Sequence, residues 1–261
     1  MGRPVPNQIL ALLVVLVLVQ GCQEKEELEK EAPALAHADL RVDRIAIGGV
    51  VSDVAALGDS TESRESWSSL IGDRLGRERF GKLPIMSYGE MGMILGPGDQ
   101  AVMLDRFKED GGCDDDVLAG LRTVLEGKAR FIVFANIQAD QVDRAEKENE
   151  VVDDKGKTTS KTRTMTTSRT TSVRLRFYDL TDRKLVWDHV AVGESVNSKS
   201  HDMSDFIEHN PKEGVLGGVL TSVANSVIKP DPGFPPAPTF EMSLTNAFDN
   251  VGLYLKPSKK K

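Results

Sequence analysis

The sequence predicts an α/β protein: a mixed sheet of about five strands with packing helices and one long protruding β-hairpin. The aliphatic runs "RIAIGGVV" and "RFIVFANI" are typical of strands that are buried on both faces. Segments with apolar residues at helical spacing separate these runs, and a long Thr-rich stretch then favours paired strands. The order strand, helix, strand, helices, three strands, helix indicates a sheet covered by helices.

The first strand is predicted over residues 45–51 and the second over 83–88, "LPIMSY". Between them, capping residues precede Trp67 and further apolar residues at helical spacing, which predicts a helix up to Leu75. A Gly- and Pro-punctuated connection is expected after Tyr88. A short helix at 101–107 and a clearer one after three consecutive aspartates, 114–116, should follow, because acidic residues stabilise helix N-termini.

The long hairpin is predicted over residues 140–176, with its turn at Asp153-Asp154-Lys155-Gly156. A second, tight turn at 181–183 leads into a strand over 185–192. Helical spacing of apolar residues over 215–227 closes a predicted α/β domain, 43–229. Residues 230–261 combine a Pro-rich segment, a short amphipathic helix from Phe240 and a basic tail.

The composition limits the classes of function. An apolar fraction of 39% can fill a core, and only 5% of the residues are aromatic, so that core should be largely aliphatic. The net charge is −7, whereas proteins that bind nucleic acids usually carry an excess of Lys and Arg on the binding face. We therefore expect no nucleic-acid partner.

The N-terminus carries an apolar run over residues 9–19, about eleven residues, which is too short to span a bilayer as a helix but fits a signal peptide. The run ends in Val19-Gln20-Gly21-Cys22, which resembles the bacterial lipobox. The resemblance implies a lipoprotein signal peptide over 1–21 and fatty-acid (palmitate) modification of Cys22. By the family's sorting rule, Gln23 implies the outer membrane, with the protein facing the periplasm. A plain secretory signal or a core helix is the alternative.

Residues 22–42 are charged and then Ala-rich, without a repeating apolar face, and predict a flexible tether. With Cys22 acylated, Cys113 has no intramolecular partner. The carboxylates beside Cys113 should raise the pKa of its thiol, so that a nucleophilic role is not expected.

No catalytic residues and no cofactor are predicted, because the sequence has no phosphate-binding glycine loop, no zinc-type cysteine pair and no Gly-x-Ser-x-Gly motif. One alternative stays open. His201, Asp205 and His209 are spaced i, i+4, i+8, and a helix there would place them on one face as a metal site of a periplasmic metal-dependent enzyme. The surrounding residues favour an ordinary solvated helix start, so no metal ligand is assigned.

The return limb of the long hairpin is basic in an otherwise acidic protein. Four of its cations, Lys157, Lys161, Arg163 and Arg169, are candidates for contact with an anionic partner. The alternative is cross-strand pairing, because the outgoing limb supplies acidic residues that would lie opposite them. These acidic residues are Asp140, Asp143, Glu146, Glu148 and Glu150.

The hairpin "YDLTDRKLVW", together with "LPIMSY", "RFIVFANI" and the lipobox, resembles periplasmic lipoproteins related to the penicillin-binding-protein activator LpoB and the N-terminal part of TolB. The curli secretion lipoprotein CsgG shares that α/β fold. The resemblance implies a membrane-anchored, non-catalytic binding or activator module with a protein or peptidoglycan partner in the envelope. A secretion-pore subunit is a further alternative, but residues 141–173 have no apolar band that would face lipid.

Overall fold

The computed structural model describes residues 40, 42–77, 83–156, 158–203 and 233–254. The predicted signal peptide, the lipidation site Cys22, most of the tether and the helix expected over 215–227 lie outside these residues.

The described strands form one five-stranded mixed sheet, which confirms the predicted fold class. The strand order is β2-β1-β3-β4-β5. β1 lies between β2 and β3 and is parallel to both, whereas β3, β4 and β5 are successively antiparallel. The strands span Ile45–Ser52 (β1), Ile85–Met86 (β2), Phe131–Val152 (β3), Thr158–Asp179 (β4) and Lys184–Asp202 (β5).

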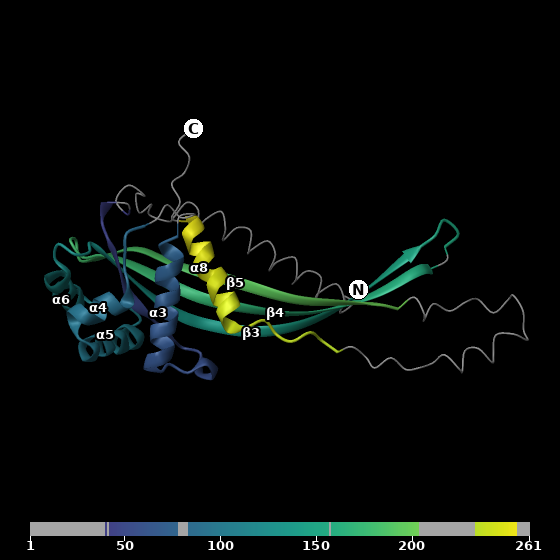
Figure 1. Cartoon of the computed structure of the whole chain (residues 1–261), viewed down its shortest axis with the longest axis horizontal. Helices are drawn as coiled ribbons and strands as arrows, with labels where there is room; N and C mark the ends of the chain where they lie inside the picture. The colour runs from purple at the N-terminus through teal and green to yellow at the C-terminus, as the bar shows by residue number, and fades with distance from the viewer. Residues whose placement is uncertain (1–39, 41, 78–82, 157, 204–232, 255–261) are drawn as a thin grey trace, which may run out of the picture.

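Helices cover both faces of the sheet. Their bounds are Thr61–Leu75 (α3), Tyr88–Leu95 (α4), Pro97–Asp110 (α5), Asp115–Leu125 (α6) and Phe240–Tyr254 (α8), with a short 3-10 helix at Ala55–Leu57 (η1). On one face, which we call the α8 face, α3 and α8 run side by side across the sheet (Figure 1). On the opposite face, the α5 face, Phe107 of α5 stacks on Phe134 of β3 with ring centroids 4.7 Å apart.

The N-termini of three helices are fixed by side-chain caps. The Ser60 hydroxyl accepts a hydrogen bond from the Ser63 N–H, and Asp114 accepts one from the Val117 N–H at 2.7 Å. Asp114, the first of the three consecutive aspartates, thus caps α6. Ser87 and Glu90 form a reciprocal capping box at the start of α4. This box ends the strand expected over 83–88 after Met86, and α4 stands where a connection was predicted.

β1 is largely aliphatic and lies in the core, and all eight of its residues are buried. Gly48 lies where a Cβ atom would fall on the ring of Phe134, which shows why a glycine is needed at this point of the strand. The parallel pairing of β1 with β3 shifts register here, between Ile47 and Gly49. Ser68 of α3 accepts a hydrogen bond from the Val50 N–H at 2.9 Å and ties the helix to the strand.

β3 and β4 pair along their whole length, from Phe131 opposite Asp179 to Val152 opposite Thr158. The sequence predicted that β5 would end near Val192, but it extends to Asp202 and pairs with β4 as far as Thr162. We use the term ribbon for residues 139–152, 158–172 and 192–202, and the term head for the helices together with the rest of the described sheet. The ribbon extends away from the head (Figure 1). The ribbon is therefore three-stranded over much of its length.

The helix predicted from Phe240 is present as α8 and packs on β4 and β5. The side-chain amides of Asn246 and Asn250 donate hydrogen bonds to the carbonyl oxygens of Glu194 and Val192, at 2.7 and 2.8 Å. The Thr171 and Ser243 hydroxyls are hydrogen-bonded at 2.6 Å below the helix. These bonds hold α8 at the base of the ribbon.

Candidate functional site

Three of the four predicted contact residues lie on β4 in the ribbon, and Lys157 lies outside the described residues. Each of the three is paired across the hairpin. Lys161 Nζ lies 3.0 Å from Glu148 and 3.2 Å from Glu150. The Arg163 guanidinium forms a bidentate pair with Glu146. The cross-strand pairing that the sequence left open is therefore present at both positions.

Arg169 is held more tightly than the other two cations. Its guanidinium binds both carboxylate oxygens of Asp140, and Thr171 donates a further hydrogen bond to the same carboxylate. The side chains of Arg169 and Asp140 are 19% and 8% exposed. The hydrogen bonds that Arg169 donates to Asp140 raise the pKa of Arg169, because they stabilise the charged form.

The Pro-rich segment before α8 lies along the face of the ribbon that carries Arg169. Thr167 donates a hydrogen bond to the Pro235 carbonyl at 2.7 Å, Asn197 to the Pro236 carbonyl at 2.8 Å and Arg169 to the Pro238 carbonyl at 3.3 Å. The Arg169 guanidinium also lies over the ring of Phe240, 5.6 Å from its centroid. In the described chain, Arg169 thus joins the ribbon to the C-terminal helix.

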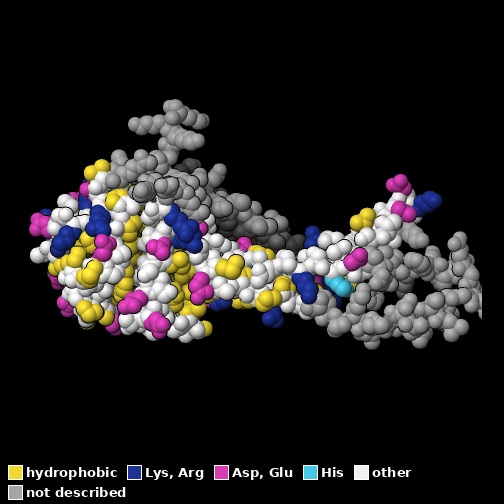
Figure 2. Space-filling view, in the orientation of Figure 1, with side chains coloured by type: hydrophobic (Ala, Val, Ile, Leu, Met, Phe, Trp, Pro, Cys, Tyr) yellow, Lys and Arg dark blue, Asp and Glu magenta, His cyan; other side chains and the backbone are white. Residues whose placement is uncertain are grey.

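The pairing leaves this part of the ribbon without an excess of positive charge. The three cations Lys161, Arg163 and Arg169 are matched by four carboxylates, those of Asp140, Glu146, Glu148 and Glu150. Figure 2 shows the same interspersion over the visible face of the head, where basic and acidic side chains alternate without forming a patch of one sign.

The α5 face of the ribbon differs, because Ser and Thr side chains dominate its central strand. Two cross-strand hydroxyl pairs stand there, Thr164 with Ser200 at 3.1 Å and Thr166 with Ser198 at 3.2 Å. The adjoining edge strand presents three half-exposed valines, Val190, Val192 and Val196, which are 42%, 50% and 50% exposed. The Thr-rich composition pointed to strands, but only the register shows which hydroxyls share a face.

The head contains a polar cavity of about 280 Å³ on the α5 face. Its wall combines the end of α5 with Asp53, which follows β1, and with side chains from β3 and β4. The lining residues are Asp53, Phe107, Lys108, Glu109, Asp110, Gly111, Asn136, Gln138, Arg174 and Arg176. Sequence reasoning missed this cavity, because its residues come from four separate elements and no local motif marks them.

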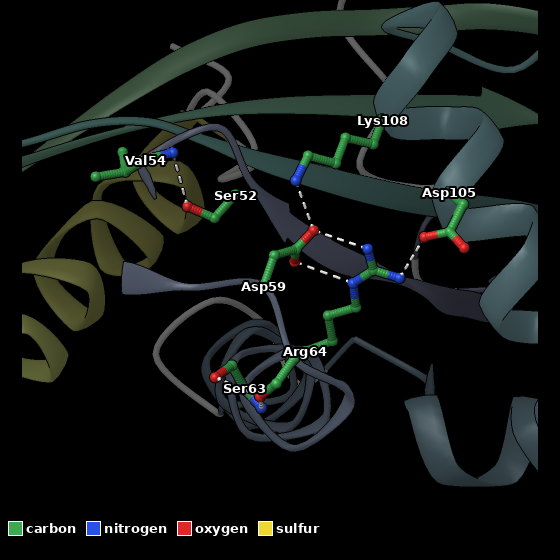
Figure 3. Close-up of polar contacts among 8 residues, drawn as sticks. Ser52, Val54, Asp59, Ser63, Arg64, Asp105 and Lys108 are labelled. Carbon is green, nitrogen blue, oxygen red and sulfur yellow. Dashed lines mark hydrogen bonds and ion pairs between the residues drawn. The ribbon is translucent and has the colours of Figure 1, made fainter. Parts of the chain in front are cut away.

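An ion-pair network shares Lys108 with the lining of this cavity (Figure 3). Asp59 binds Arg64 and Lys108, each at 2.7 Å, and Arg64 also binds Asp105 at 2.8 Å. Burial opposes ionisation of Asp59, but the hydrogen bonds from Arg64 and Lys108 outweigh it and hold the pKa of this carboxyl below its usual range. Two carboxylates and two cations balance within the network, which joins the start of α3 to α5.

The alternative metal site required a helix that begins at His201. His201 lies in β5, opposite Arg163 of β4, and not on a helix; Asp205 and His209 lie outside the described residues. The strand continues through His201 because β4 offers a pairing partner that the local sequence does not show. Among the described residues, no group of three or more His, Cys, Asp or Glu side chains is placed to hold a metal ion.

Cys113 is half-buried at the turn between α5 and α6. Burial, followed by the negative charge of Asp114, raises the pKa of its thiol to about 12. The Tyr178 hydroxyl accepts a hydrogen bond from the Cys113 N–H at 3.1 Å and fixes the turn against β4. The thiol is therefore protonated at neutral pH.

No helix in the described ranges is both long and apolar enough to cross a membrane.

Neither a family model nor a curated protein matches this chain. Solved structures that are similar to it include the hypothetical protein CT253 from Chlamydia trachomatis, 16% identical, with a TM-score of 0.35, covering 58% of this chain and 72% of that one. Lipoprotein GNA1162 from Neisseria meningitidis is 12% identical, with a TM-score of 0.29 and coverages of 72% and 99%.

The C-terminal domain of LpoB from Salmonella enterica is 8% identical, with a TM-score of 0.29 and coverages of 57% and 81%. The structural neighbours thus include bacterial lipoproteins at low identity. All three TM-scores lie below 0.5, so nothing about the function of this chain is derived from them.

Proposed function

We propose that the protein is a cell-envelope lipoprotein that acts as a non-catalytic binding or activator module. In this proposal, acylated Cys22 anchors it in the outer membrane and the folded part faces the periplasm, where it contacts a protein or peptidoglycan partner. The sequence "VQGC" supports the anchor, because it combines the lipobox pattern with an apolar segment of signal-peptide length.

The observation that carries the binding role is the ribbon. β3 and β4 have 22 residues each, which corresponds to about 70 Å at about 3.3 Å per residue. A sheet that served only to support the head would need no such extension, because the buried part of β3 ends near Ile137. The extension exposes polar backbone and side chains on an ordered support, which suits recognition of a partner.

The outer end of the ribbon is the first target for a test. Replacing residues 151–160 with Asn-Gly would join Glu150 to Lys161, which lie opposite each other, by a two-residue turn. The pairing of β4 with β5 begins at Thr162 and is retained. We expect the shortened protein to fold but to recover fewer envelope partners when it is purified from membranes. Unchanged recovery with an intact fold would refute the role of the tip.

Removal of one ion pair tests whether the basic residues contact the partner directly. The double variant Arg163→Gln, Glu146→Gln removes both charges of the pair, and Glu148, which lies opposite Arg163, keeps its ion pair with Lys161. If Arg163 touches the partner, this variant loses partner recovery although its thermal unfolding midpoint is unchanged. If only the cohesion of the ribbon matters, recovery equals that of the unmodified protein.

The anchor is tested separately by mass spectrometry of the protein extracted from membranes. We expect a mature chain that begins at acylated Cys22, and we expect a Cys22→Ser variant to lose membrane association. An unmodified Cys22, or a mature N-terminus elsewhere, would overturn the assignment to the outer membrane without affecting the proposed role of the ribbon.

A further inference from the structure

The cavity in the head lies at the point where the strand order of the sheet reverses. β1 is parallel to β2 on one side and to β3 on the other, so the chain leaves β1 in one direction and later returns on the opposite side. In open α/β sheets, ligands bind beside the carboxyl ends of strands at such a switch point. Asp53 directly follows β1, and the neighbouring Asn136 and Gln138 of β3 line the same cavity.

Two arginines on this wall share a single carboxylate. Asp188 accepts hydrogen bonds from Arg174 at 2.7 and 2.8 Å and from Arg176 Nε at 3.2 Å. Within the described residues, the remaining guanidinium N–H groups of both arginines bond no acceptor. The Arg176 side chain is only 16% exposed, so its free donors are also poorly solvated. One unbalanced positive charge with free donors suits a carboxylate.

The cavity lining also carries three carboxylates. Asp53, Glu109 and Asp110 form no ion pair with a described residue, and Asp53 accepts only the hydrogen bond from Asn136 Nδ2, at 2.7 Å. Lys108 also lines the cavity, but its ammonium group is held by Asp59 at 2.7 Å (Figure 3). These carboxylates therefore favour a ligand that also carries a cationic group, and they would repel a purely anionic ligand.

The two ends of the cavity are separated by about two strand spacings. Val51 of β1 lies opposite Asn136 of β3, and Asn136 lies opposite Arg174 of β4. At about 4.8 Å per strand, the backbone at Val51 is about 10 Å from that at Arg174, and with Asp53 two residues further along the chain the corresponding distance is about 12 Å. A cavity of about 280 Å³ is at the lower end of the range for ligand pockets and excludes large cofactors.

We propose that this cavity binds a small zwitterion of dipeptide size, with its carboxylate on the free donors of Arg174 and Arg176 and its ammonium group toward Asp53. The two ends of a dipeptide are several bonds apart, which suits the separation of the arginines on β4 from Asp53 after β1. This site lies in the head and does not depend on partner binding by the ribbon.

Alanyl-alanine is a suitable probe, and two derivatives each lack one charged end. N-acetyl-alanyl-alanine has no ammonium group, and alanyl-alanine amide has no carboxylate. Calorimetric titration of the full mature chain in detergent should show saturable binding of alanyl-alanine and about tenfold weaker binding of each derivative, because each lacks one charge-assisted contact.

Two substitutions connect each end of the ligand to its proposed contact. Asp53→Asn should weaken alanyl-alanine binding about tenfold but leave binding of the acetylated derivative unchanged. Arg176→Gln should weaken binding of alanyl-alanine and of its acetylated derivative, and should leave binding of the amide unchanged. Arg122→Gln, which removes a cation outside the cavity, is the matched control.

Circular dichroism verifies that each variant is folded before titration. Since Asp53 is exposed at the end of β1, its substitution keeps the test valid even if the Arg176 variant fails to fold. The proposal is overturned if alanyl-alanine gives no saturable binding at millimolar concentration. It is equally overturned if Asp53→Asn weakens the acetylated derivative as much as the free dipeptide.

Discussion

Gly193 of β5 lies directly against the backbone of α8 at Ala247. A Cβ atom built on Gly193 would fall on the Ser243 carbonyl oxygen and the Ala247 nitrogen. The strand and the helix are thus in contact through their main chains, with no side chain between them. This close approach brings Asn246 and Asn250 within hydrogen-bonding distance of the carbonyl groups of β5.

The first prediction concerns this contact. Gly193→Ala should displace α8 and lower the free energy of unfolding by about 3 kcal/mol, because backbone atoms cannot rotate away from the added methyl group. Urea unfolding measures the change. Gly120→Ala in α6 is the control: nothing lies within 4 Å of a Cβ atom there, so the alanine should be neutral or slightly stabilising. Equal destabilisation by both substitutions would contradict the close packing of α8.

The second prediction concerns the ion pair of Arg169 with Asp140. Asp140→Asn should lower the free energy of unfolding by about 2 kcal/mol, because it leaves a largely buried guanidinium with a neutral partner. The same substitution at Asp182, whose pair with Lys184 is exposed, should leave the unfolding midpoint unchanged. If Asp140→Asn behaves like Asp182→Asn, Arg169 does not hold the C-terminal helix against the ribbon.

The third prediction concerns stability at acidic pH. The pKa of Asp59 is lower in the folded protein than its usual value of 3.8. Its ion pairs therefore contribute stability that is fully present above the pKa of the unfolded chain, about 3.9, and is lost as the pH falls through the folded pKa. Asp59→Asn should cost about 1 kcal/mol at pH 7.

The difference between the two proteins should narrow below about pH 4, because the carboxyl of the unfolded chain then binds a proton, which the native carboxyl binds only at lower pH. Urea unfolding of both proteins between pH 7 and pH 2 measures this difference. Burial opposes ionisation of Asp188, but its hydrogen bonds to Arg174 and Arg176 lower its pKa as well. Protonation of Asp188 on acidification therefore destabilises both proteins equally. A difference that stays constant over the whole range would show that the charge of Asp59 does not stabilise the fold.

The fourth prediction concerns the reactivity of Cys113. With the pKa of its thiol at about 12, very little thiolate is present at pH 8, and alkylation requires the thiolate. Iodoacetamide should modify folded Cys113 at least about a hundredfold more slowly than the unfolded chain. Peptide mass spectrometry at timed intervals gives both rates. Rapid modification of the folded protein would show that the thiol is more accessible than the structure indicates.

Periodicity predicted those elements whose burial is set by the local sequence. The aliphatic β1 and β3, the N-terminal cap of α6 and the amphipathic α8 could each be derived from their own residues. Two elements could not. α4 contains glycines and was taken for a connection, but its capping box and the burial of Tyr88 and Met91 stabilise it. β5 continues past Val192 because β4 supplies its partner, a non-local interaction.

The candidate functional residues also divide into those that the local sequence predicted and those that depend on non-local contacts. The alternation of charge along the hairpin limbs suggested cross-strand pairing. The register places Glu148 opposite Arg163 and Glu150 opposite Lys161. Further ion pairs run diagonally, from Arg163 to Glu146 and from Lys161 to Glu148. The cavity was not predictable, because Asp53, Asn136 and Arg176 are separated by long stretches of sequence and meet only across three strands of the sheet.

The two asparagines of α8 have a consequence for the solubility of the protein. β5 is the last strand of the sheet, and an uncovered last strand can pair with another chain and begin aggregation. Asn246 and Asn250 bind the carbonyl groups through which such a strand would attach, at Glu194 and Val192. The C-terminal helix thus protects this stretch of the sheet against unwanted strand addition.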